Sequence, residues 1–315
     1  MRILLIVNTS ASSVTARARV VIHKALAADH DVRVAETARR GHATRLARGA
    51  AAEGAGAVVV LGGDGTVNEA ANGLVDTPTA LGVLPGGSTN VFARTIGMTN
   101  DPIEATGELM AALATGAIRA VSLGVVNGRY FLFHVGLGFD AAVVAAVERR
   151  STIKRYLGHA VFLSAAVATW SGGYDRHRPH FSARLTLADG SARTVGDGYL
   201  GICLKTNPYT YLGEHPLDLA PGTGLDSPLC LVTLRRLDLP TLLGVTTAAL
   251  RGGRRVAGRR HVDVAPEVDT IVIEAGSPLP YQVDGDYLGE AEHLELRWER
   301  DRLRLIVPAA GGSSP

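Results

Sequence analysis

Two short segments rich in glycine, serine and threonine carry residue types that bind phosphate groups. The first reads Gly62-Gly63-Asp64-Gly65-Thr66-Val67-Asn68-Glu69, and the second reads Pro85-Gly86-Gly87-Ser88-Thr89-Asn90. Glycine lets a backbone approach a phosphate closely and adopt dihedral angles that a Cβ forbids. A helix that starts at such a loop offers free N–H groups and the positive end of its dipole, and Thr66 can cap it or donate to a phosphate oxygen.

Both segments follow short apolar runs, Val58–Leu61 and Leu81–Leu84, which are typical of buried strands. Either segment alone would also fit an ordinary tight turn between a strand and a helix. Two such loops at the ends of neighbouring strands instead favour a single crevice of phosphate size.

Three common motifs do not fit these loops. A dinucleotide fingerprint requires G-x-G-x-x-G, but Asn68 stands where the third glycine belongs. A Walker A loop ends in Gly-Lys-Ser/Thr, and none of the lysines, Lys24, Lys154 and Lys205, follows a glycine loop. No G-x-S-x-G elbow surrounds Ser88, so the hydrolase motif is absent as well.

The first third of the chain alternates short apolar runs with helical segments. This pattern predicts an α/β domain of three layers, with a parallel sheet covered by helices on both faces. The predicted strands are Ile3–Val7, Val32–Ala35, Ala57–Leu61 and Leu81–Leu84, and the predicted helices are Thr15–Ala28, Ala43–Glu53, Val67–Leu74 and one from Val91.

The pattern changes near residue 120 to strands joined by tight turns. Asn127-Gly128, Asp189-Gly190 and Asp284-Gly285 each lie between two strand-like runs and predict hairpins. We therefore expect a mostly antiparallel, β-sandwich-like domain with one helical insertion, about Ser151 to Trp170. The predicted domains are residues 1–122 and 123–291, followed by C-terminal strands over 292–308 that could return to the first domain and a disordered tail over 309–315.

Composition limits the class of protein. The chain has 315 residues, 46% of them hydrophobic, and a net charge of +2, which gives no reason to expect nucleic-acid binding. Cys203 and Cys230 have no spacing of a disulfide framework or a zinc site. The N-terminal apolar run is too short for a signal peptide, and Ala160–Trp170 falls short of the roughly 20 residues of a membrane span. A cytoplasmic protein without a transmembrane segment is expected.

Four motifs resemble those of one family of kinases. The first loop, Gly62 to Glu69, closely resembles the signature shared by diacylglycerol, sphingosine and ceramide kinases, and NAD kinases and phosphofructokinases carry shorter relatives of it. The segment Pro85 to Arg94 is similar to the lipid-kinase motif P-x-G-[ST]-x-N-D-F-A-R. Asn8-Thr9-Ser10-Ala11-Ser12 is a weakened N-P-x-[SA]-G, and Gln282-Val283-Asp284-Gly285-Asp286 resembles Q-x-D-G-E. The chain thus resembles the diacylglycerol kinase catalytic-domain family along nearly its whole length.

The resemblance implies ATP and Mg²⁺ as cofactors, and a nucleotide domain and a β-rich lipid-substrate domain that enclose a cleft. Asp286 would be the general base that accepts the proton of the substrate hydroxyl, with Asp284 orienting it or holding a metal-bound water. Asp64 would belong to the magnesium and water network. The residues expected around the nucleotide are Asn8, Thr9, Ser10, Thr37, Gly62, Gly63, Asp64, Gly65, Thr66, Asn68, Glu69, Gly87, Ser88, Thr89 and Asn90.

Three positions depart from the family pattern. Val91 replaces an aspartate of the second loop, and Asp286 replaces a glutamate that is one methylene longer. The family's structural-metal segment, D-D-G after an apolar residue, corresponds to Leu225-Asp226-Ser227-Pro228-Leu229, where Ser227 replaces the aspartate expected to ligate the metal. That metal site would therefore be absent or shifted to Asp226, which leaves Asp64 and Asp226 as the expected metal ligands.

The leading expectation is an ATP-dependent lipid kinase of phospholipid metabolism that phosphorylates diacylglycerol or a related long-chain alcohol. Two alternatives stay open: a degenerate kinase that only binds nucleotide or lipid, and a kinase of a soluble acceptor such as NAD. The lipid would be met at the inner face of the membrane, where Arg251, Arg254, Arg255, Arg259 and Arg260 form either a solvated helix end or a patch for anionic headgroups. The apolar stripe of Phe162, Leu163, Val167 and Trp170 is either core or acyl-chain pocket, and a homodimer stays open.

Overall fold

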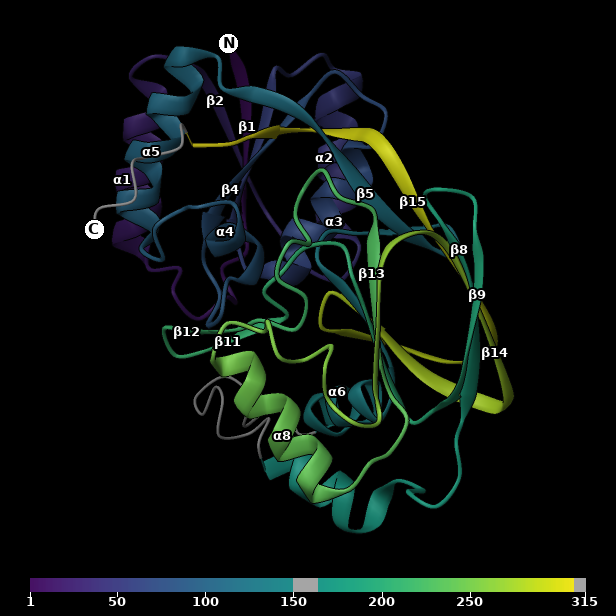
Figure 1. Cartoon of the computed structure of the whole chain (residues 1–315). Helices are drawn as coiled ribbons and strands as arrows, with labels where there is room; N and C mark the ends of the chain where they lie inside the picture. The colour runs from purple at the N-terminus through teal and green to yellow at the C-terminus, as the bar shows by residue number, and fades with distance from the viewer. Residues whose placement is uncertain (150–163, 309–315) are drawn as a thin grey trace. The chain divides into compact units, whose positions relative to one another are not determined.

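The computed structural model describes residues 1–149 and 164–308 and divides the chain into two compact units. Unit 1 consists of Met1–Ser122 together with the segment from Arg300 onward, and unit 2 of Leu123–Glu299. Two strands connect the units along the chain (Figure 1): β5 (Ile118–Val126) and β15 (Asp286–Ile306).

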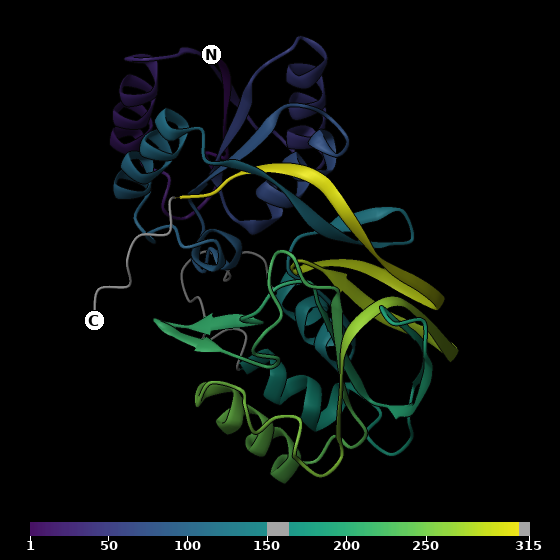
Figure 2. The ribbon, with the colours of Figure 1, turned by 45° about the horizontal axis from the view of Figure 1, so that its top comes forward.

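Unit 1 is an α/β unit in which strands and helices alternate. Four strands pair in parallel in the order β4-β3-β1-β2, and the end of β15 joins β4 in parallel through Leu305 and Leu81. In both views α1 and α5 lie on one side of these strands, and α2 and α3 lie on the other (Figures 1 and 2). The elements are β1 (Arg2–Val7), α1 (Ala16–Ala27), β2 (Asp31–Glu36), α2 (His42–Ala52), β3 (Ala57–Gly62), α3 (Asp64–Leu74), β4 (Ala80–Pro85), α4 (Val91–Thr95) and α5 (Pro102–Thr115).

The residues of these elements explain their form. Every residue of β3 and β4 is buried, as expected for central strands covered on both faces. Thr15 caps α1 by accepting from the Ala18 amide at 3.1 Å, and Asp101 caps α5 with Pro102 at its first position. The short strand-to-helix connections place the start of α3 directly after β3.

Unit 2 is rich in β-strands that pair antiparallel. β14 pairs with β7, β8, β13 and β15, and β10 lies between β7 and β13. An apolar core of the unit includes Phe131, Leu137, Leu231, Ile271 and Leu296. The elements are β6 (Arg129–Phe131), β7 (His134–Gly138), α6 (Phe139–Arg149), the π-helix η1 (Thr169–Gly173), β8 (Phe181–Leu187), β9 (Ala192–Gly198), β10 (Leu200–Leu204), β11 (Thr210–Leu212), β12 (His215–Leu217), β13 (Leu229–Leu234), α8 (Leu239–Leu250) and β14 (Val262–Val283).

The prediction of an α/β N-terminal part and a β-rich, antiparallel C-terminal part is confirmed. The three Asx-Gly hairpins are present, since β5 pairs with β6, β8 with β9, and β14 with β15 across them. One run is divided differently from our prediction. The run from Tyr130 to Gly136 breaks into β6 and β7, because the amides of Leu132 and Phe133 donate to the Asp284 carboxylate rather than to a strand.

Some sequence predictions fall on residues outside the described part of the chain. Phe162 and Leu163 of the apolar stripe and the tail 309–315 lie there, whereas Val167 is 59% exposed. Cys203 and Cys230 are buried free thiols. In the described ranges, no helix combines the length and the hydropathy needed to span a bilayer.

Candidate functional site

The ends of four strands bring the predicted nucleotide residues of unit 1 together. The parallel register aligns Val7 with Leu61 and with Glu36, and Gly62 with Pro85. Asn8, Thr37, Gly63 and Gly86 therefore follow four adjacent strands at their carboxyl ends, where ligands bind in open α/β sheets. The Asn8 amide donates to the Leu61 carbonyl at 3.0 Å, and the Thr37 amide donates to that of Val7 at 2.9 Å.

The two glycine loops lie against each other backbone to backbone. The Gly86 amide donates to the Gly62 carbonyl at 2.9 Å. A Cβ at Gly86 would lie 2.8 Å from the Gly62 Cα, and a Cβ at Gly87 would lie 2.9 Å from the Gly63 Cα. Such distances are shorter than real Cβ contacts, so these positions require glycine. The two loops are therefore neighbours, and a phosphate-sized crevice formed by them stays a prediction.

The N-terminal segment 8–13 forms hydrogen bonds with both glycine loops. The Asn8 Nδ2 donates to the Thr66 Oγ1 at 2.9 Å, while the Asn8 Oδ1 accepts from the Ser10 amide at 3.0 Å. Ser13 donates from its hydroxyl to the Gly87 carbonyl at 3.1 Å. Thr9 and Ser10 are exposed beside this network. Thr66 is thus oriented by Asn8, a contact that the sequence analysis did not predict.

The Asp64 carboxylate caps a helix of its own unit. Its two oxygens accept from the amides of Val91 at 3.0 Å and Phe92 at 2.9 Å, at the N-terminus of α4. Burial raises the pKa of Asp64 above its ordinary value, while these amide hydrogen bonds act in the opposite direction. The carboxylate therefore joins the two glycine loops, because Asp64 starts α3 and α4 follows the second loop.

The Glu69 and Asn68 side chains contact helices rather than the two glycine loops. Glu69 accepts from the amides of Gly41 at 2.8 Å and Ala43 at 3.1 Å and thereby caps α2, whose N-cap glycine offers no side chain. Asn68 is 1% exposed and accepts from Asn72. Both residues support the helix behind the loop.

Several amides of the loops keep no protein partner. Among the described residues, nothing accepts from the amides of Gly63, Gly65, Ser88 and Thr89. The Ser88 side chain is exposed, and Asn90 holds its loop by accepting from the Gly87 amide at 2.7 Å. Unpaired amides beside a helix N-terminus form the kind of site that binds phosphate oxygens.

In unit 2, Asp284 is buried and binds backbone rather than solvent. Its carboxylate accepts from three successive amides, those of Leu132 at 2.7 Å, Phe133 at 3.0 Å and His134 at 3.0 Å. The side chain is 3% exposed, and the residue adopts the left-handed conformation with φ 48°. Asp284 therefore fixes the hairpin turn against the segment between β6 and β7.

Asp286 begins β15 two residues later and keeps access to solvent. Its side chain is 24% exposed, and its Oδ2 lies 3.3 Å from the Arg129 Nη2. Of the two aspartates in this turn, Asp286 is the one whose carboxylate is partly exposed to solvent.

A buried polar network behind the turn was missed by the sequence analysis. The Gly285 amide donates to the Gln282 Oε1 at 2.8 Å, and the Gln282 Nε2 donates to the Asp140 Oδ2 at 2.9 Å. Tyr209 donates to the other oxygen of Asp140 at 2.5 Å, and burial raises the pKa of Asp140. Gly136 is required here, because a Cβ would lie 1.7 Å from the Asp140 Oδ2. That glycine was the available signal, but its meaning depends on the contact between Asp140 and Gln282, which are 142 positions apart.

His134 lies at the edge of this network and is 5% exposed. Its ring lies 4.7 Å from that of Tyr209, and its Nδ1 is buried with no hydrogen-bond partner among the described residues. Burial lowers the pKa of His134 to about 3, so the imidazole is neutral at physiological pH.

The expected structural-metal segment does not fit a divalent cation. Asp226 is exposed, and the Ser227 Oγ accepts from the Gly224 amide at 2.6 Å. The carbonyls of this segment bind the ammonium group of Lys205 instead. Over residues 1–149 and 164–308, no three His, Cys, Asp or Glu side chains gather as a metal site.

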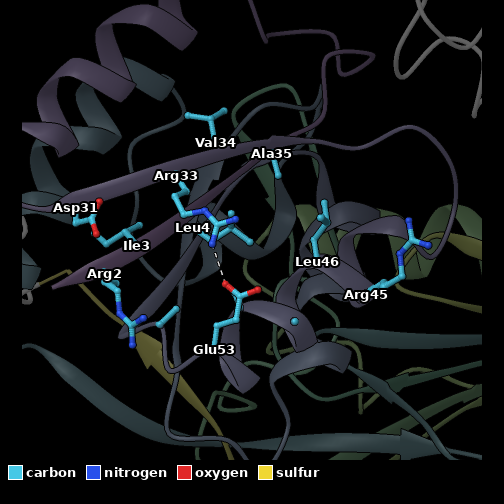
Figure 3. A pocket seen from close by; sticks show the side chains of 13 residues that line it. Arg2, Ile3, Leu4, Asp31, Arg33, Val34, Ala35, Arg45, Leu46 and Glu53 are labelled. Carbon is cyan, nitrogen blue, oxygen red and sulfur yellow. Dashed lines mark hydrogen bonds and ion pairs between the residues drawn. The ribbon is translucent and has the colours of Figure 1, made fainter.

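A surface pocket of about 230 Å³ lies elsewhere in unit 1 (Figure 3). It includes Arg2 and Asp31, at the amino ends of β1 and β2, whereas the glycine loops follow the carboxyl ends. The Arg33–Glu53 ion pair, at 2.8 Å, lies across it. The pocket therefore takes no part in the candidate site.

Known proteins place the chain in a family. The family model of the diacylglycerol kinase catalytic domain matches residues 2–126. A Pseudomonas fluorescens protein named "Probable lipid kinase YegS-like" is 30% identical over 300 residues, which cover 92% of this chain and 90% of that protein. The diacylglycerol kinase of Bacillus subtilis is 27% identical over 272 residues, 85% of this chain and 84% of that protein. The chain belongs to the diacylglycerol kinase catalytic-domain family of lipid kinases.

The fold is shared with a solved relative as well. A crystal structure of a diacylglycerol kinase from Bacillus anthracis superposes with a TM-score of 0.69 at 21% identity, covering 98% of this chain and 97% of that one. The whole two-unit chain, rather than the first unit alone, therefore has this family's fold.

Proposed function

We propose that the protein transfers the γ-phosphate of ATP to the hydroxyl group of diacylglycerol or a related long-chain lipid alcohol. The observation that carries this proposal is the pair of glycine loops in unit 1, which touch through Gly86 and Gly62 and keep unpaired amides at a helix N-terminus. The lipid acceptor is supported by the names of the relatives, a diacylglycerol kinase and lipid kinases.

In unit 1 the backbone supplies most of the binding. The amides of Gly63, Gly65, Ser88 and Thr89 donate to the phosphate oxygens of ATP, and Thr66, held by Asn8, adds a hydroxyl. Asp64 is the carboxylate that we assign to the magnesium ion of ATP, since each of its oxygens keeps a lone pair beyond its amide hydrogen bond. When bound, magnesium neutralises phosphate charge.

In unit 2 the hairpin supplies the base. Asp286 accepts the proton of the lipid hydroxyl while that oxygen attacks the γ-phosphorus of ATP, and the bond from the γ-phosphorus to the bridging oxygen breaks to release ADP. Asp284 does not take part in proton transfer in this proposal, because three amides already bind its carboxylate. Its role is to hold the turn in the conformation that presents Asp286.

A nucleotide-binding protein without transfer activity is the second candidate. It is favoured by one observation: Val91 supplies only a backbone amide where the family has an aspartate, and that amide binds Asp64. ATP binding without labelling of any lipid would support this candidate.

We propose that the membrane-binding surface lies on α8 of unit 2. Leu239, Leu243 and Leu250 are 49%, 64% and 41% exposed and share one face at helical spacing, whereas Val245 and Ala249 are buried. Arg251, Arg254, Arg255 and Arg260 follow this face, are exposed, and have no ion-pair partner in the described part of the chain. Leucines beside unpaired arginines suit an anionic lipid surface, each charge contributing on the order of 1 kcal/mol.

The proposal is tested by following labelled phosphate from γ-labelled ATP with magnesium into lipids in detergent micelles. The acceptors are diacylglycerol, monoacylglycerol, sphingosine and ceramide, with NAD as the soluble control. Label in a lipid and none in NAD is the expected result. Label in NAD alone would overturn the lipid acceptor.

A further inference from the structure

Lys205 lies in the interior of unit 2, directly after β10. Its relative exposure is 0%, which is rare for lysine, because an ammonium group loses its hydration when it is buried. A lysine at such a position must satisfy three N–H donors inside the protein.

Three backbone carbonyls satisfy these donors. The Lys205 Nζ donates to the carbonyl oxygens of Gly224 at 3.0 Å, Leu225 at 3.0 Å and Ser227 at 3.1 Å. Three carbonyls of one short loop that converge on a single point form a cation site. Here the cation is covalently part of the chain.

Ser227 closes the loop around this point. Its hydroxyl accepts from the Gly224 amide at 2.6 Å and donates to the Gly224 carbonyl at 3.0 Å. The Ser227 hydroxyl thus holds the loop in the conformation that points its carbonyls at Lys205. A divalent ion would need a carboxylate ligand at this position to be bound firmly.

Lys205 is also connected, through its backbone amide, to the hairpin that carries the candidate base. The Lys205 amide donates to the Phe133 carbonyl at 2.8 Å, and the Phe133 amide donates to the Asp284 carboxylate at 3.0 Å. The 224–227 loop, Lys205, the 132–134 segment and Asp284 form one continuous chain of contacts.

We propose that the Lys205 ammonium is an internal replacement for a bound metal ion, so that unit 2 keeps its hairpin in place without any divalent cation. The positive charge occupies the carbonyls of Gly224, Leu225 and Ser227 and excludes a metal from them. This proposal concerns the stability of unit 2 and does not depend on the lipid kinase activity.

Thermal unfolding without nucleotide tests the proposal on the wild-type protein first. The melting temperature is measured in EDTA, in Mg²⁺ and in Ca²⁺, and we expect the three values to agree. A divalent ion that stabilises the wild type, with an effect that Asp226→Ala removes, would overturn the proposal.

Two variants then test the ammonium itself. Lys205→Met removes the ammonium that donates to the carbonyls of Gly224, Leu225 and Ser227, and we expect its melting temperature to fall by about 10 °C. Lys205→Ala combined with Ser227→Asp vacates the carbonyls and adds a carboxylate, and we expect Mg²⁺ or Ca²⁺ to raise the melting temperature of this double variant alone. A Lys205→Met protein as stable as the wild type, or a double variant unaffected by both ions, would contradict the replacement.

Discussion

Each unit has an Asp-Gly pair in its candidate site, Asp64-Gly65 in unit 1 and Asp284-Gly285 in unit 2, and the two pairs have different structural roles. Asp64 and Gly65 start a helix in unit 1, where the carboxylate caps α4 and the glycine amide has no partner within the described residues. Asp284 and Gly285 form a hairpin turn in unit 2, where the carboxylate accepts three amides and the glycine amide is bound by Gln282. In both units the aspartate organises backbone beside the proposed chemistry. In our proposal the loop amides and Asp64 bind ATP and its magnesium in unit 1, whereas in unit 2 the base is Asp286 and not Asp284.

This comparison predicts first that the loops of unit 1 tolerate no side chain at Gly87. A valine there would push the loop away from the Gly63 Cα, which a Cβ at Gly87 would approach to 2.9 Å. We expect ATP affinity to fall by at least about 100-fold, since backbone amides supply most of the binding. Isothermal titration calorimetry measures the loss.

The matched control is Gly107→Ala, which adds a methyl group in the interior of α5 where nothing lies within 4 Å. Its ATP affinity should equal that of the wild type. If Gly87→Val bound ATP normally while remaining folded, the glycine loops would not be the nucleotide site.

Asp284 should matter for stability far more than Asp286. Asp284→Asn keeps one acceptor oxygen for three buried amides, so we expect the free energy of unfolding to fall by about 3 kcal/mol. Asp286→Asn alters a part-exposed ion pair and should change stability by less than about 1 kcal/mol. Urea denaturation of both variants measures the difference, and equal losses would remove the distinction between the two aspartates.

His134 makes unit 2 sensitive to acid. Its pKa is about 3 in the folded protein and about 6.5 when unfolded, so below pH 6.5 the unfolded chain gains a proton that the folded protein does not. Stability is therefore lost as the pH falls from 6.5 toward 3, by about 2 kcal/mol at pH 5.

Urea denaturation at pH 7 and pH 5 tests this loss. His134→Phe should reduce the difference between the two pH values by that amount, whereas a substitution of the exposed His177 by Gln should not. An unchanged difference in His134→Phe would show that another group titrates.

The smallest predicted effect concerns the α8 surface. Replacing Leu239, Leu243 and Leu250 by serine should weaken binding to vesicles of mixed neutral and anionic phospholipid by about tenfold. Transfer to a lipid in detergent micelles should stay unchanged. The control replaces Val20 and Val21, exposed on α1 at 54% and 38%, by serine. Binding that ignores both these leucines and the anionic lipid content would move the membrane contact to another surface.

The parts of the structure that depend on local sequence could be predicted. The glycine loops and the three Asx-Gly hairpins are encoded within a few residues, because dihedral preferences and strand patterns decide them. The division of roles between Asp284 and Asp286 could not be predicted, since it depends on amides about 150 positions earlier. The caps made by Asp64 and Glu69 and the carbonyl contacts of Lys205 likewise require partners 19 to 28 positions away.

The measurement that tests the central claim most directly compares wild type with Asp286→Asn in two assays, ATP binding by calorimetry and transfer of labelled phosphate to diacylglycerol. The account predicts unchanged ATP affinity and a loss of transfer of about 100-fold or more. An Asp286→Asn enzyme that labels diacylglycerol at the wild-type rate would contradict the assignment of the base to the hairpin of unit 2.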